Sequence, residues 1–554
     1  MKQRTYGERE VIDFVIVGSG AAGGVLAKEL ATAGFDVVVL EQGPWQTEAQ
    51  FTHDELTVER QQAMLNRAFE PDQTFRTTAA EAARVNASRG LAYRRAVGGS
   101  TVHFAANYWR FRPIDFNERS VLGPMSGTGF ADWPIAYEEL EPYYTKVDWE
   151  IGVSGAPGPF DPPRSRPYAL PPLPNKSSGV LLERGARALG LHAQVAPMAV
   201  LSRPFGGRSA CMACGRCTLY GCEFGAKSSS LVTVIPAAIA TGRCELRADS
   251  TVFRVETSPR GEATGVLYWD KDGTERRQLA RAVVLAANGA ETARLLLLST
   301  SPKFPHGLAN SSGNVGRHIM FNGTSSTTGR FEHPTNEYKG AVASHIVLDY
   351  YDTDPNRGFY GGGGIDARFP FGPIGFAVDG LPAELPTWGS EYKRALRDYY
   401  THSVRFVSHI TSIPMPGNTV TLDPIHRDRW GRPALCLTYQ DHPDDMLAKQ
   451  WFRDRMQEIM EAAGAVRVWN QPVTPVEGGF HLLGTARMGN DPRDSVVDRY
   501  HRAHDVPNLF ICDGSSFVTS GRGQPTMTIQ ALAFRAGDHI ARFARLGQRR
   551  RRPR

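Results

Sequence analysis

The chain has 554 residues, of which 41% are hydrophobic and 22% charged, a composition typical of soluble globular proteins. Because this length exceeds what one compact core can bury, two or three packed domains are expected. The formal net charge is +6, and part of it comes from arginines near the C-terminus. We expect residues 546–554 to form a solvated basic tail, so the charge gives nucleic-acid binding little support.

The sequence gives no sign of export or membrane anchoring. Its N-terminal residues lack the apolar core of a signal peptide, and no run of about 18 apolar residues occurs. We therefore expect no membrane span. The expected location is the cytoplasm, or the periplasm if the chain is exported on the signal of a partner subunit.

The first predicted elements are a buried strand, a glycine-rich turn and a helix. Residues 13–24 read Asp-Phe-Val-Ile-Val-Gly-Ser-Gly-Ala-Ala-Gly-Gly, and residues 25–30 continue with helical spacing. Gly18, Gly20 and Gly23 allow a tight turn and let a pyrophosphate approach the helix N-terminus, where unpaired N–H groups favour anions. In this strand–helix context, the glycine pattern indicates a dinucleotide-binding unit.

A second apolar strand is predicted at residues 36–40, and it ends in Glu41. This carboxylate lies about twenty residues beyond the glycines, where it can accept hydrogen bonds from a ribose diol and disfavours a 2′-phosphate. A glycine-rich turn in some other α/β fold is the alternative, but the full order of elements argues against it. These features leave both FAD and NAD open.

Three later segments decide between the two cofactors. Residues 95–103 read Arg-Ala-Val-Gly-Gly-Ser-Thr-Val-His, and residues 283–292 read Val-Val-Leu-Ala-Ala-Asn-Gly-Ala-Glu-Thr. The third segment is the C-terminal block at residues 479–528. Together with the N-terminal fingerprint, these segments resemble the glucose–methanol–choline (GMC) oxidoreductase family, over about residues 10–545, and this resemblance implies FAD.

The resemblance also implies the fold. We expect an α/β flavin-binding domain of GMC type, discontinuous and Rossmann-like, with an α+β substrate domain built on an antiparallel sheet. The flavin-binding domain would comprise residues 10–130, 206–318 and 471–545. Residues 131–205, which are rich in proline, and residues 319–470 would form wrapping coil and the substrate domain.

The resemblance assigns further residues to the flavin. His103 occupies the position at which several family members attach the flavin covalently. The alternative is a histidine that packs against the ring without a bond. The remaining assigned residues are Gly98 and Gly99 beside the isoalloxazine, Ala287 in the late nucleotide-domain turn, and Asp513 and Gly514 near the ribityl and pyrophosphate groups.

Within the family, three segments resemble the large flavoprotein subunits of bacterial sugar and sugar-acid dehydrogenases. These are residues 105–113, 132–135 and 141–144. This likeness implies a sugar or alcohol substrate, a small partner subunit, and a cytochrome or quinone as electron acceptor.

The catalytic candidates are His481 and Gln524. Oxidation of an alcohol requires a base for the hydroxyl proton and a group that stabilises the developing alkoxide. His481 matches the family's catalytic histidine, and an imidazole titrates near neutral pH. Gln524 stands where the family has histidine or asparagine, and its amide can donate a hydrogen bond but cannot act as a base. For Arg522, a positive charge near the substrate and an ordinary structural salt bridge are both open.

Four of the seven cysteines fall within twelve residues: Cys211, Cys214, Cys217 and Cys222. Disulfides between cysteines three residues apart are geometrically awkward. The spacing favours an iron–sulfur cluster, either 3Fe–4S or 4Fe–4S, held by three or four thiolates. Zinc and cysteines that only pack are the alternatives.

The sequence thus predicts an FAD-dependent dehydrogenase that oxidises a hydroxyl of a sugar, glycoside or polyol by hydride transfer to flavin N5. Its electrons would leave through the iron–sulfur cluster to a partner acceptor. Two alternatives share the fold: an oxygen-using alcohol or sugar oxidase, and a lyase that keeps FAD without redox turnover.

Overall fold

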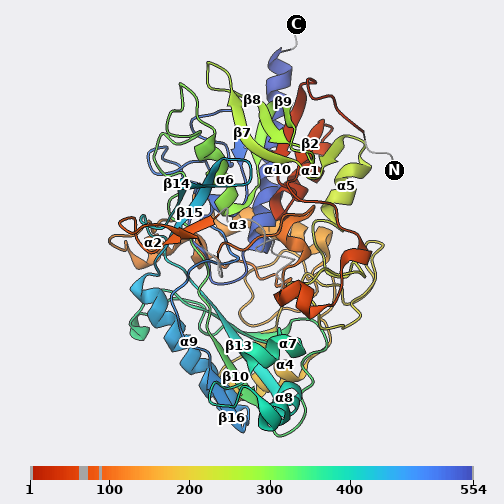
Figure 1. Cartoon of the computed structure of the whole chain (residues 1–554), viewed down its shortest axis with the longest axis vertical. Coiled ribbons are helices and arrows are strands. Elements are labelled where there is room, and N and C mark those ends of the chain that lie inside the picture. Colours follow the sequence, from red (N-terminus) through yellow and green to blue (C-terminus); the bar gives the residue numbers. More distant parts are fainter. Residues whose placement is uncertain (1–3, 61–72, 86–89, 552–554) are drawn as a thin grey trace.

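The structure is a computed structural model that describes residues 4–60, 73–85 and 90–551. The chain folds into two halves, each built on a β-sheet, which follow one another along the long axis of the molecule (Figure 1). The expected combination of an α/β half and a half built on an antiparallel sheet is confirmed.

The upper half in Figure 1 contains a sheet with strand order β6-β2-β1-β9-β8-β7, in which β17 also pairs with β9. Its strands are β1 (Ile12–Val17), β2 (Val37–Leu40), β6 (Cys244–Arg247), β7 (Thr251–Thr257), β8 (Ala263–Trp269), β9 (Glu275–Leu285) and β17 (Leu509–Ile511). The central strand β1 is parallel to both β2 and β9. Both β1 and β2 are apolar and almost completely buried, as expected for parallel strands covered on both faces.

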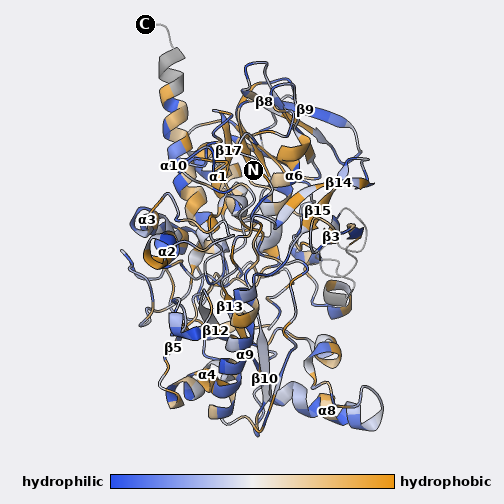
Figure 2. Cartoon of the chain, turned by 90° about the vertical axis from the view of Figure 1, so that its left-hand side faces the viewer, coloured by the Kyte–Doolittle hydropathy of each residue, from blue (hydrophilic) through white to orange (hydrophobic). Residues whose placement is uncertain are grey.

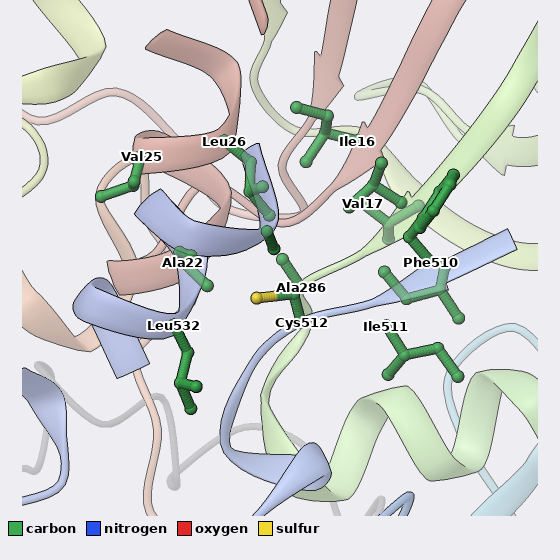
Figure 3. Packing of buried hydrophobic residues seen from close by; sticks show 14 of the residues in the cluster. Ile16, Val17, Ala22, Val25, Leu26, Ala286, Phe510, Ile511, Cys512 and Leu532 are labelled. Carbon is green, nitrogen blue, oxygen red and sulfur yellow. The ribbon is translucent and has the colours of Figure 1, made fainter. Parts of the chain in front are cut away.

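Helices cover this sheet and complete its core. They are α1 (Ala21–Thr32), α5 (Val234–Ala240), α6 (Asn288–Leu298) and α10 (Thr526–Arg551). Helix α1 contacts both α5 and α10. Figure 3 shows Ile16 of β1, Leu26 of α1, Ile511 of β17, Cys512 and Leu532 of α10 in one buried cluster. Segments from both ends of the chain therefore hold the nucleotide-binding turn in place.

The lower half contains an antiparallel sheet with strand order β16-β10-β13-β12-β11-β5. Its strands are β5 (Ala193–Val195), β10 (Ser326–Arg330), β11 (Ala343–Val347), β12 (Gly363–Arg368), β13 (Ser403–Ile410) and β16 (Arg467–Asn470). Helix α9 (Pro443–Ala462) packs on β10 and β13, and α4 (Ser177–Ala188) packs on β11. Phe452, Met456 and Ile459 of α9 are completely buried in the core of this half.

A third sheet, with strand order β14-β15-β3-β4, joins segments that lie far apart in the sequence. Its strands are β3 (Gln73–Arg76), β4 (Arg84–Val85), β14 (Thr419–Arg427) and β15 (Pro433–Thr438). Strand β15 from the expected substrate segment pairs in parallel with β3 from the expected flavin segment. Each of the two large sheets takes its strands from the segments of one expected domain. The small sheet combines strands from both expected domains, so the domain boundaries stay a prediction.

Several segments are more regular than the sequence suggested. The proline-rich region expected as wrapping coil contains α3 (Tyr137–Val147), α4 and β5. Helix α8 (Gly389–His402) gives a weak helical signal in the sequence, because only Tyr399 on it is buried and its apolar face is narrow. In the glycine run at residues 361–364, Gly363 and Gly364 begin β12.

The C-terminal end of the chain is helical rather than frayed up to Arg551. Figures 1 and 2 show the last turns of α10 projecting beyond the body of the molecule. The rest of the expected basic tail, residues 552–554, lies outside the described residues. Among the helices that the structure describes, none combines the length and apolar character that a membrane crossing requires.

Candidate active site

The turn between β1 and α1 is shaped by its glycines. Gly18 has φ +93°, and a Cβ atom on it would lie 2.5 Å from the carbonyl oxygen of Ala286. Gly20 is different, because a Cβ atom there would meet only the Cα atom of Gly99, at 4.0 Å. Gly20 and Ala21, the first residue of α1, line a cavity. The turn therefore opens at a helix N-terminus, where unpaired N–H groups suit an anionic pyrophosphate.

Glu41 follows β2 and lines the same cavity. Its carboxylate accepts hydrogen bonds from the backbone N–H of Ser19 at 3.0 Å, the hydroxyl of Ser19 at 2.8 Å and the N–H of Gly43 at 3.0 Å. Burial raises the pKa of Glu41 to about 6, although these hydrogen bonds oppose the shift. Glu41 is thus a fixed acceptor at the place where a ribose diol is expected.

The cavity extends from this turn to the predicted catalytic histidine. Its volume is about 600 Å³, within the range of roughly 300–1,000 Å³ typical of ligand sites. Gly18, Gly20 and Glu41 line it, and so do His481 and Gln524. A glycine turn, a buried acceptor and the predicted catalytic histidine in one cavity fit an FAD molecule, because its pyrophosphate, its ribose and its ring need these features.

His103 lines the cavity after η3 (Gly99–Val102) and is only 4% exposed. Its Nε2 lies 3.2 Å from the side-chain oxygen of Gln46, and its Nδ1 has no hydrogen-bond partner among the described residues. Burial, together with the charges of Lys227 and Arg94, holds the pKa of His103 well below its usual value. The imidazole is therefore neutral, as a nucleophilic attachment to the flavin would require.

The other residues predicted to bind the flavin fall into two groups. The residues of the first group line the cavity: Gly99, Ala287, Asp513 and Gly514. Within this group, Asp513 accepts hydrogen bonds from the hydroxyl of Thr292 at 2.6 Å and from the N–H of Ser515 at 2.8 Å, and burial raises its pKa. The residues of the second group, Gly23 and Gly98, do not line the cavity.

Gly23 and Gly98 have packing roles instead. A Cβ atom on Gly23 would lie 1.9 Å from the carbonyl oxygen of Gly18, so glycine lets α1 approach the turn closely. Gly98 has φ +91°, and a Cβ atom there would lie 2.9 Å from the side chain of Leu231. These two glycines shape the walls of the cavity without facing it.

His481 is held in one orientation by Asn322. The Nδ2 of Asn322 donates to the carbonyl oxygens of Ile410, Ser520 and Gly521, at 3.3, 3.4 and 3.2 Å. Because the amide nitrogen is used in this way, the amide oxygen must be the atom that faces His481. The Nδ1–H of His481 donates to that oxygen at 2.8 Å. The proton is thereby kept on Nδ1, and Nε2 carries the lone pair.

Desolvation, the nearby ring of His409 and the charge of Arg368 together lower the pKa of His481 to about 3, although a hydrogen bond with Gln524 opposes the shift. The exposed part of the ring belongs to the cavity wall. His481 is therefore neutral across the physiological pH range, and it has the form in which it can accept a proton from a hydroxyl group.

Gln524 contacts a second histidine that sequence reasoning missed. Its Nε2 lies 2.9 Å from Nδ1 of His409, near the end of β13. The Nε2 of His409 lies 3.1 Å from the carboxylate of Asp366 on β12. The same ring nitrogen lies 2.9 Å from a guanidinium nitrogen of Arg368, so His409 is held between Asp366, Arg368 and Gln524. Gln524 also forms a hydrogen bond with His481.

Arg522 forms a structural ion pair and does not bring free charge to the cavity. It is completely buried, and its guanidinium donates to Asp115 at 2.8 Å and to Glu118, both on α2 (Ile114–Leu122). The hydroxyl of Tyr351 donates to the same Asp115 at 2.6 Å. This cluster ties the loop that carries Gln524 to α2.

The structure does not support the predicted metal site. Cys214 is exposed and Cys217 is buried, while Cys211 and Cys222 are half-buried. Within the described ranges, no group of three or more His, Cys, Asp or Glu side chains is arranged to hold a metal ion. The expected iron–sulfur cluster is therefore not supported, and neither is the zinc alternative.

The physical reason lies in how the cysteine loop is anchored. The ammonium group of Lys227 donates to the carbonyl oxygens of Cys217 and Tyr220, at 2.7 and 2.6 Å, and so draws this part of the loop into the core. Burial raises the pKa of Cys217 to about 12, so its thiol is protonated at neutral pH. Cys217 is thus buried while Cys214 is exposed, and the four cysteines differ in their surroundings.

Comparisons with known proteins agree with this geometry. Profiles of the GMC oxidoreductase family match residues 12–320 and 414–533. The chain is 36% identical over 540 residues to 2-methyl-1,2-propanediol dehydrogenase of Mycolicibacterium austroafricanum, covering 96% of this chain and 95% of that protein. It is 28% identical over 557 residues to the fructose dehydrogenase large subunit of Gluconobacter japonicus, covering 95% and 97%.

A solved structure has the same fold. Pyridoxine 4-oxidase from Mesorbium loti superposes with a TM-score of 0.61 at 18% sequence identity, covering 96% of this chain and 99% of that chain. At this low identity, the match supports the fold alone.

Proposed function

The chain belongs to the GMC oxidoreductase family, and from this we propose that it is a dehydrogenase that oxidises a hydroxyl of a sugar, glycoside or polyol. Family membership establishes an FAD-dependent oxidoreductase acting on CH–OH donors. One observation supports the proposed chemistry most directly: Asn322 keeps the proton of His481 on Nδ1, so that Nε2 carries a lone pair in the same cavity that the glycine turn lines.

The chain's own residues suggest how FAD is held. Gly18, Gly20 and Glu41 would hold the adenosine and pyrophosphate end, while Gly99 and His103 would lie against the ring. Ala287, Asp513 and Gly514 would contact the intervening part. When bound, FAD supplies the two-electron acceptor that takes a hydride at N5 from the substrate carbon.

In the proposed step, the hydroxyl proton goes to His481 and the two electrons go to the flavin. The Nε2 of His481 accepts the proton of the substrate hydroxyl, and Asn322 keeps the opposite ring nitrogen protonated throughout. The C–H bond of the same carbon breaks, and its two electrons leave with the hydrogen as hydride. The alcohol becomes an aldehyde or ketone. The amide of Gln524, which contacts His409 and His481, would donate to the substrate oxygen while negative charge develops on it.

We further propose that His103 bonds covalently to the flavin. The support is a buried neutral imidazole in the cavity wall whose Nδ1 lacks a partner among the described residues. The test is to denature the protein in acid and measure flavin in the pellet and the supernatant. Flavin that stays with the pellet in the wild type but not in a His103→Ala variant is the expected result. Complete release from the wild type would contradict it.

The electron acceptor is proposed to be a cytochrome or quinone, reached with the help of a small partner subunit. The support is the relative described as a large subunit, which implies a further subunit in that protein. The proposed electron path does not include an iron–sulfur cluster, because the described residues contain no group of three or more His, Cys, Asp or Glu side chains arranged to hold a metal ion. Residence in the cytoplasm, or in the periplasm with an exported partner, stays a proposal.

An iron and acid-labile sulfide assay on the purified flavoprotein tests the cysteine loop. The described geometry predicts flavin without stoichiometric iron. About three or four irons per flavin would instead restore the cluster that the cysteine spacing suggested.

A substrate screen tests the proposed function. The FAD-loaded protein would be incubated with polyols and sugars, using an artificial electron acceptor in one series and oxygen in another. Reduction of the artificial acceptor with little peroxide is the expected result. Rapid peroxide formation would identify an oxidase, and a flavin that no alcohol reduces would favour a non-redox role.

A further inference from the structure

We propose that Asp366 determines substrate specificity: by offsetting the charge of Arg368 beside Gln524, it selects neutral hydroxylated substrates and rejects those that carry a carboxylate. This inference rests on the proposed function, which leaves the charge of the substrate open. It concerns a cluster on β12 and β13 that the proposed proton and hydride transfers do not use.

Asp366 is completely buried, and donors surround its carboxylate. The Nε of Arg368 donates to Oδ1 at 2.6 Å, and a second guanidinium nitrogen donates to Oδ2. Oδ2 also accepts from Nε2 of His409 at 3.1 Å and from Nδ2 of Asn107 at 3.3 Å. Burial alone would raise the pKa of Asp366, but Arg368 and His409 outweigh it and lower the pKa to about 2. The carboxylate is therefore ionised.

The net charge of this cluster is zero. The negative charge of Asp366 offsets the positive charge of Arg368, and burial lowers the pKa of His409, so that this ring is neutral. Burial, His409 and the charge of Arg368 lower the pKa of His481, so this ring is neutral as well. Arg368 and His409 line the cavity together with Gln524 and His481, so the substrate end presents hydrogen-bonding groups without excess positive charge.

Other arginines of the cavity wall are placed elsewhere. Arg94 lies close enough to His103 to lower its pKa. Arg294 pairs with Asp428, and Arg432 lies over the ring of Phe253. Arg368 is thus the arginine that accompanies His409 and Gln524 at the catalytic end, and its carboxylate-binding fork is already occupied by Asp366.

Asn107 strengthens the preference for hydroxyl groups. Its Nδ2 donates to Asp366, while its Oδ1 is buried and has no hydrogen-bond partner within the described part of the chain. Asn107 lines the cavity. An unpartnered acceptor can receive a hydrogen bond from a hydroxyl but not from a carboxylate, which has only acceptor atoms. A carboxylate placed here would also lie near the negative charge of Asp366.

The test uses pairs of compounds that differ only by a hydroxymethyl group in place of a carboxylate. Suitable pairs are propane-1,2-diol with lactate, glycerol with glycerate, and glucitol with gluconate. In each pair that reacts, we expect kcat/KM of the wild type to be at least about tenfold higher for the neutral member, because like charges in a desolvated site repel strongly. Equal or higher kcat/KM for the acids would overturn the proposal.

The Asp366→Asn variant tests the residue itself. It leaves the charge of Arg368 without a counter-charge, so we expect the ratio of kcat/KM for the acid to kcat/KM for the neutral member to rise by about tenfold or more. The double variant Asp366→Asn with Arg368→Gln removes both charges, and the gain should disappear. A purely structural role of Asp366 would lower both activities without moving their ratio.

Asp398→Asn is the matched control. Asp398 also pairs with an arginine through two hydrogen bonds, from Arg330 at 2.7 and 3.0 Å, but it lies on α8 and does not line the cavity. The ratio should be unchanged in this variant. An equal change in ratio for Asp398→Asn would show that any lost ion pair has this effect, and it would overturn the assignment to Asp366.

Binding measurements on the wild type keep the proposal testable if Asp366→Asn fails to fold or if none of the pairs turns over. Each compound would be titrated into the FAD-loaded wild type while the flavin absorbance is followed. Weaker perturbation by the acids at equal concentration supports the proposal. Tighter binding of the acids overturns it. Failure of every alcohol to reduce the flavin would instead count against the proposed function.

Discussion

The two ends of the cavity are built in different ways. At the nucleotide end, Gly18 and Glu41 come from one short stretch that forms β1, α1 and β2 in succession. At the catalytic end, Asn322, His409 and His481 come from segments that are more than seventy residues apart and are brought together by the lower sheet and the loops above it. A local motif therefore specifies the first end, whereas only the complete fold specifies the second.

The largest expected effect is a loss of kcat from a substitution that disables the catalytic end alone. A His481→Asn variant removes the base, so we expect kcat to fall by at least about 10²-fold, since a positioned general base contributes roughly 10²–10⁴-fold. Bound FAD and melting temperature should be unchanged, because the glycine turn is distant in the cavity. The measurements are steady-state kinetics with an artificial acceptor and the flavin absorbance per protein. Activity close to that of the wild type would show that another group is the base.

The next largest effect is a loss of FAD from a substitution at the nucleotide end. Gly18→Ala places a Cβ atom 2.5 Å from the oxygen of Ala286 at a φ of +93°. Backbone strain of this kind costs about 1–3 kcal/mol before the steric clash is added. We expect a lower melting temperature and loss of FAD. The matched variant Gly20→Ala has space for its Cβ atom, so it should keep its melting temperature while binding FAD less tightly. Full FAD content in Gly18→Ala would contradict this account of the turn.

A third prediction sharpens the catalytic end by testing how His481 is oriented. In Asn322→Leu the Nδ1–H of His481 loses its acceptor, and kcat should fall by about 10–100-fold, since an unsatisfied buried group costs roughly 1–3 kcal/mol. In Asn322→Asp the acceptor is kept, but its charge raises the pKa of His481. Activity requires the neutral ring and is lost as pH falls through that pKa, so this variant should lose activity at a higher pH than the wild type does. Identical pH profiles would contradict the assignment.

The smallest expected effect concerns stability in acid, and it reaches beyond the cavity. Burial lowers the pKa of His318 and His481 to about 3 and that of His501 to about 4, from an ordinary value of 6.5. The unfolded chain therefore takes up protons first as pH falls. Their contribution to stability is complete above pH 6.5 and is lost below it, by up to about 1.4 kcal/mol per pH unit for each histidine.

Melting temperatures measured from pH 7 to pH 5 test this linkage. We expect a decline in the wild type that becomes shallower in His501→Gln, while the exposed His306→Gln serves as control and should follow the wild type. A flat profile in the wild type would mean that these histidines are not buried in neutral form.

The same contrast explains what the sequence could predict. The glycine turn, Glu41 and the strand before Asp513 are local patterns, and the structure places them around one cavity. His481 was identified by its motif. Asn322, His409 and Asp366 were missed because no short motif surrounds them. Their proximity depends on the pairing of β12 with β13 and on the position of the loop before β10.

The cysteine loop shows the limit of a local pattern. Its spacing brings four thiols close together along the chain, which favoured a metal site. Convergence in space depends instead on contacts from outside the motif, above all on Lys227, which draws the carbonyl oxygen of Cys217 into the core. Helix α8 was missed for a related reason, because most of its surface faces away from the core and few apolar positions mark it.

The most direct test of the central claim is anaerobic mixing of the FAD-loaded protein with a polyol, followed through the flavin absorbance in the wild type and in His481→Asn. We predict that the polyol bleaches the flavin in the wild type and does so at least about 10²-fold more slowly in the variant. Equal rates in the two proteins would contradict the assignment of His481 as the base, and a flavin that stays oxidised with every polyol would contradict the dehydrogenase itself.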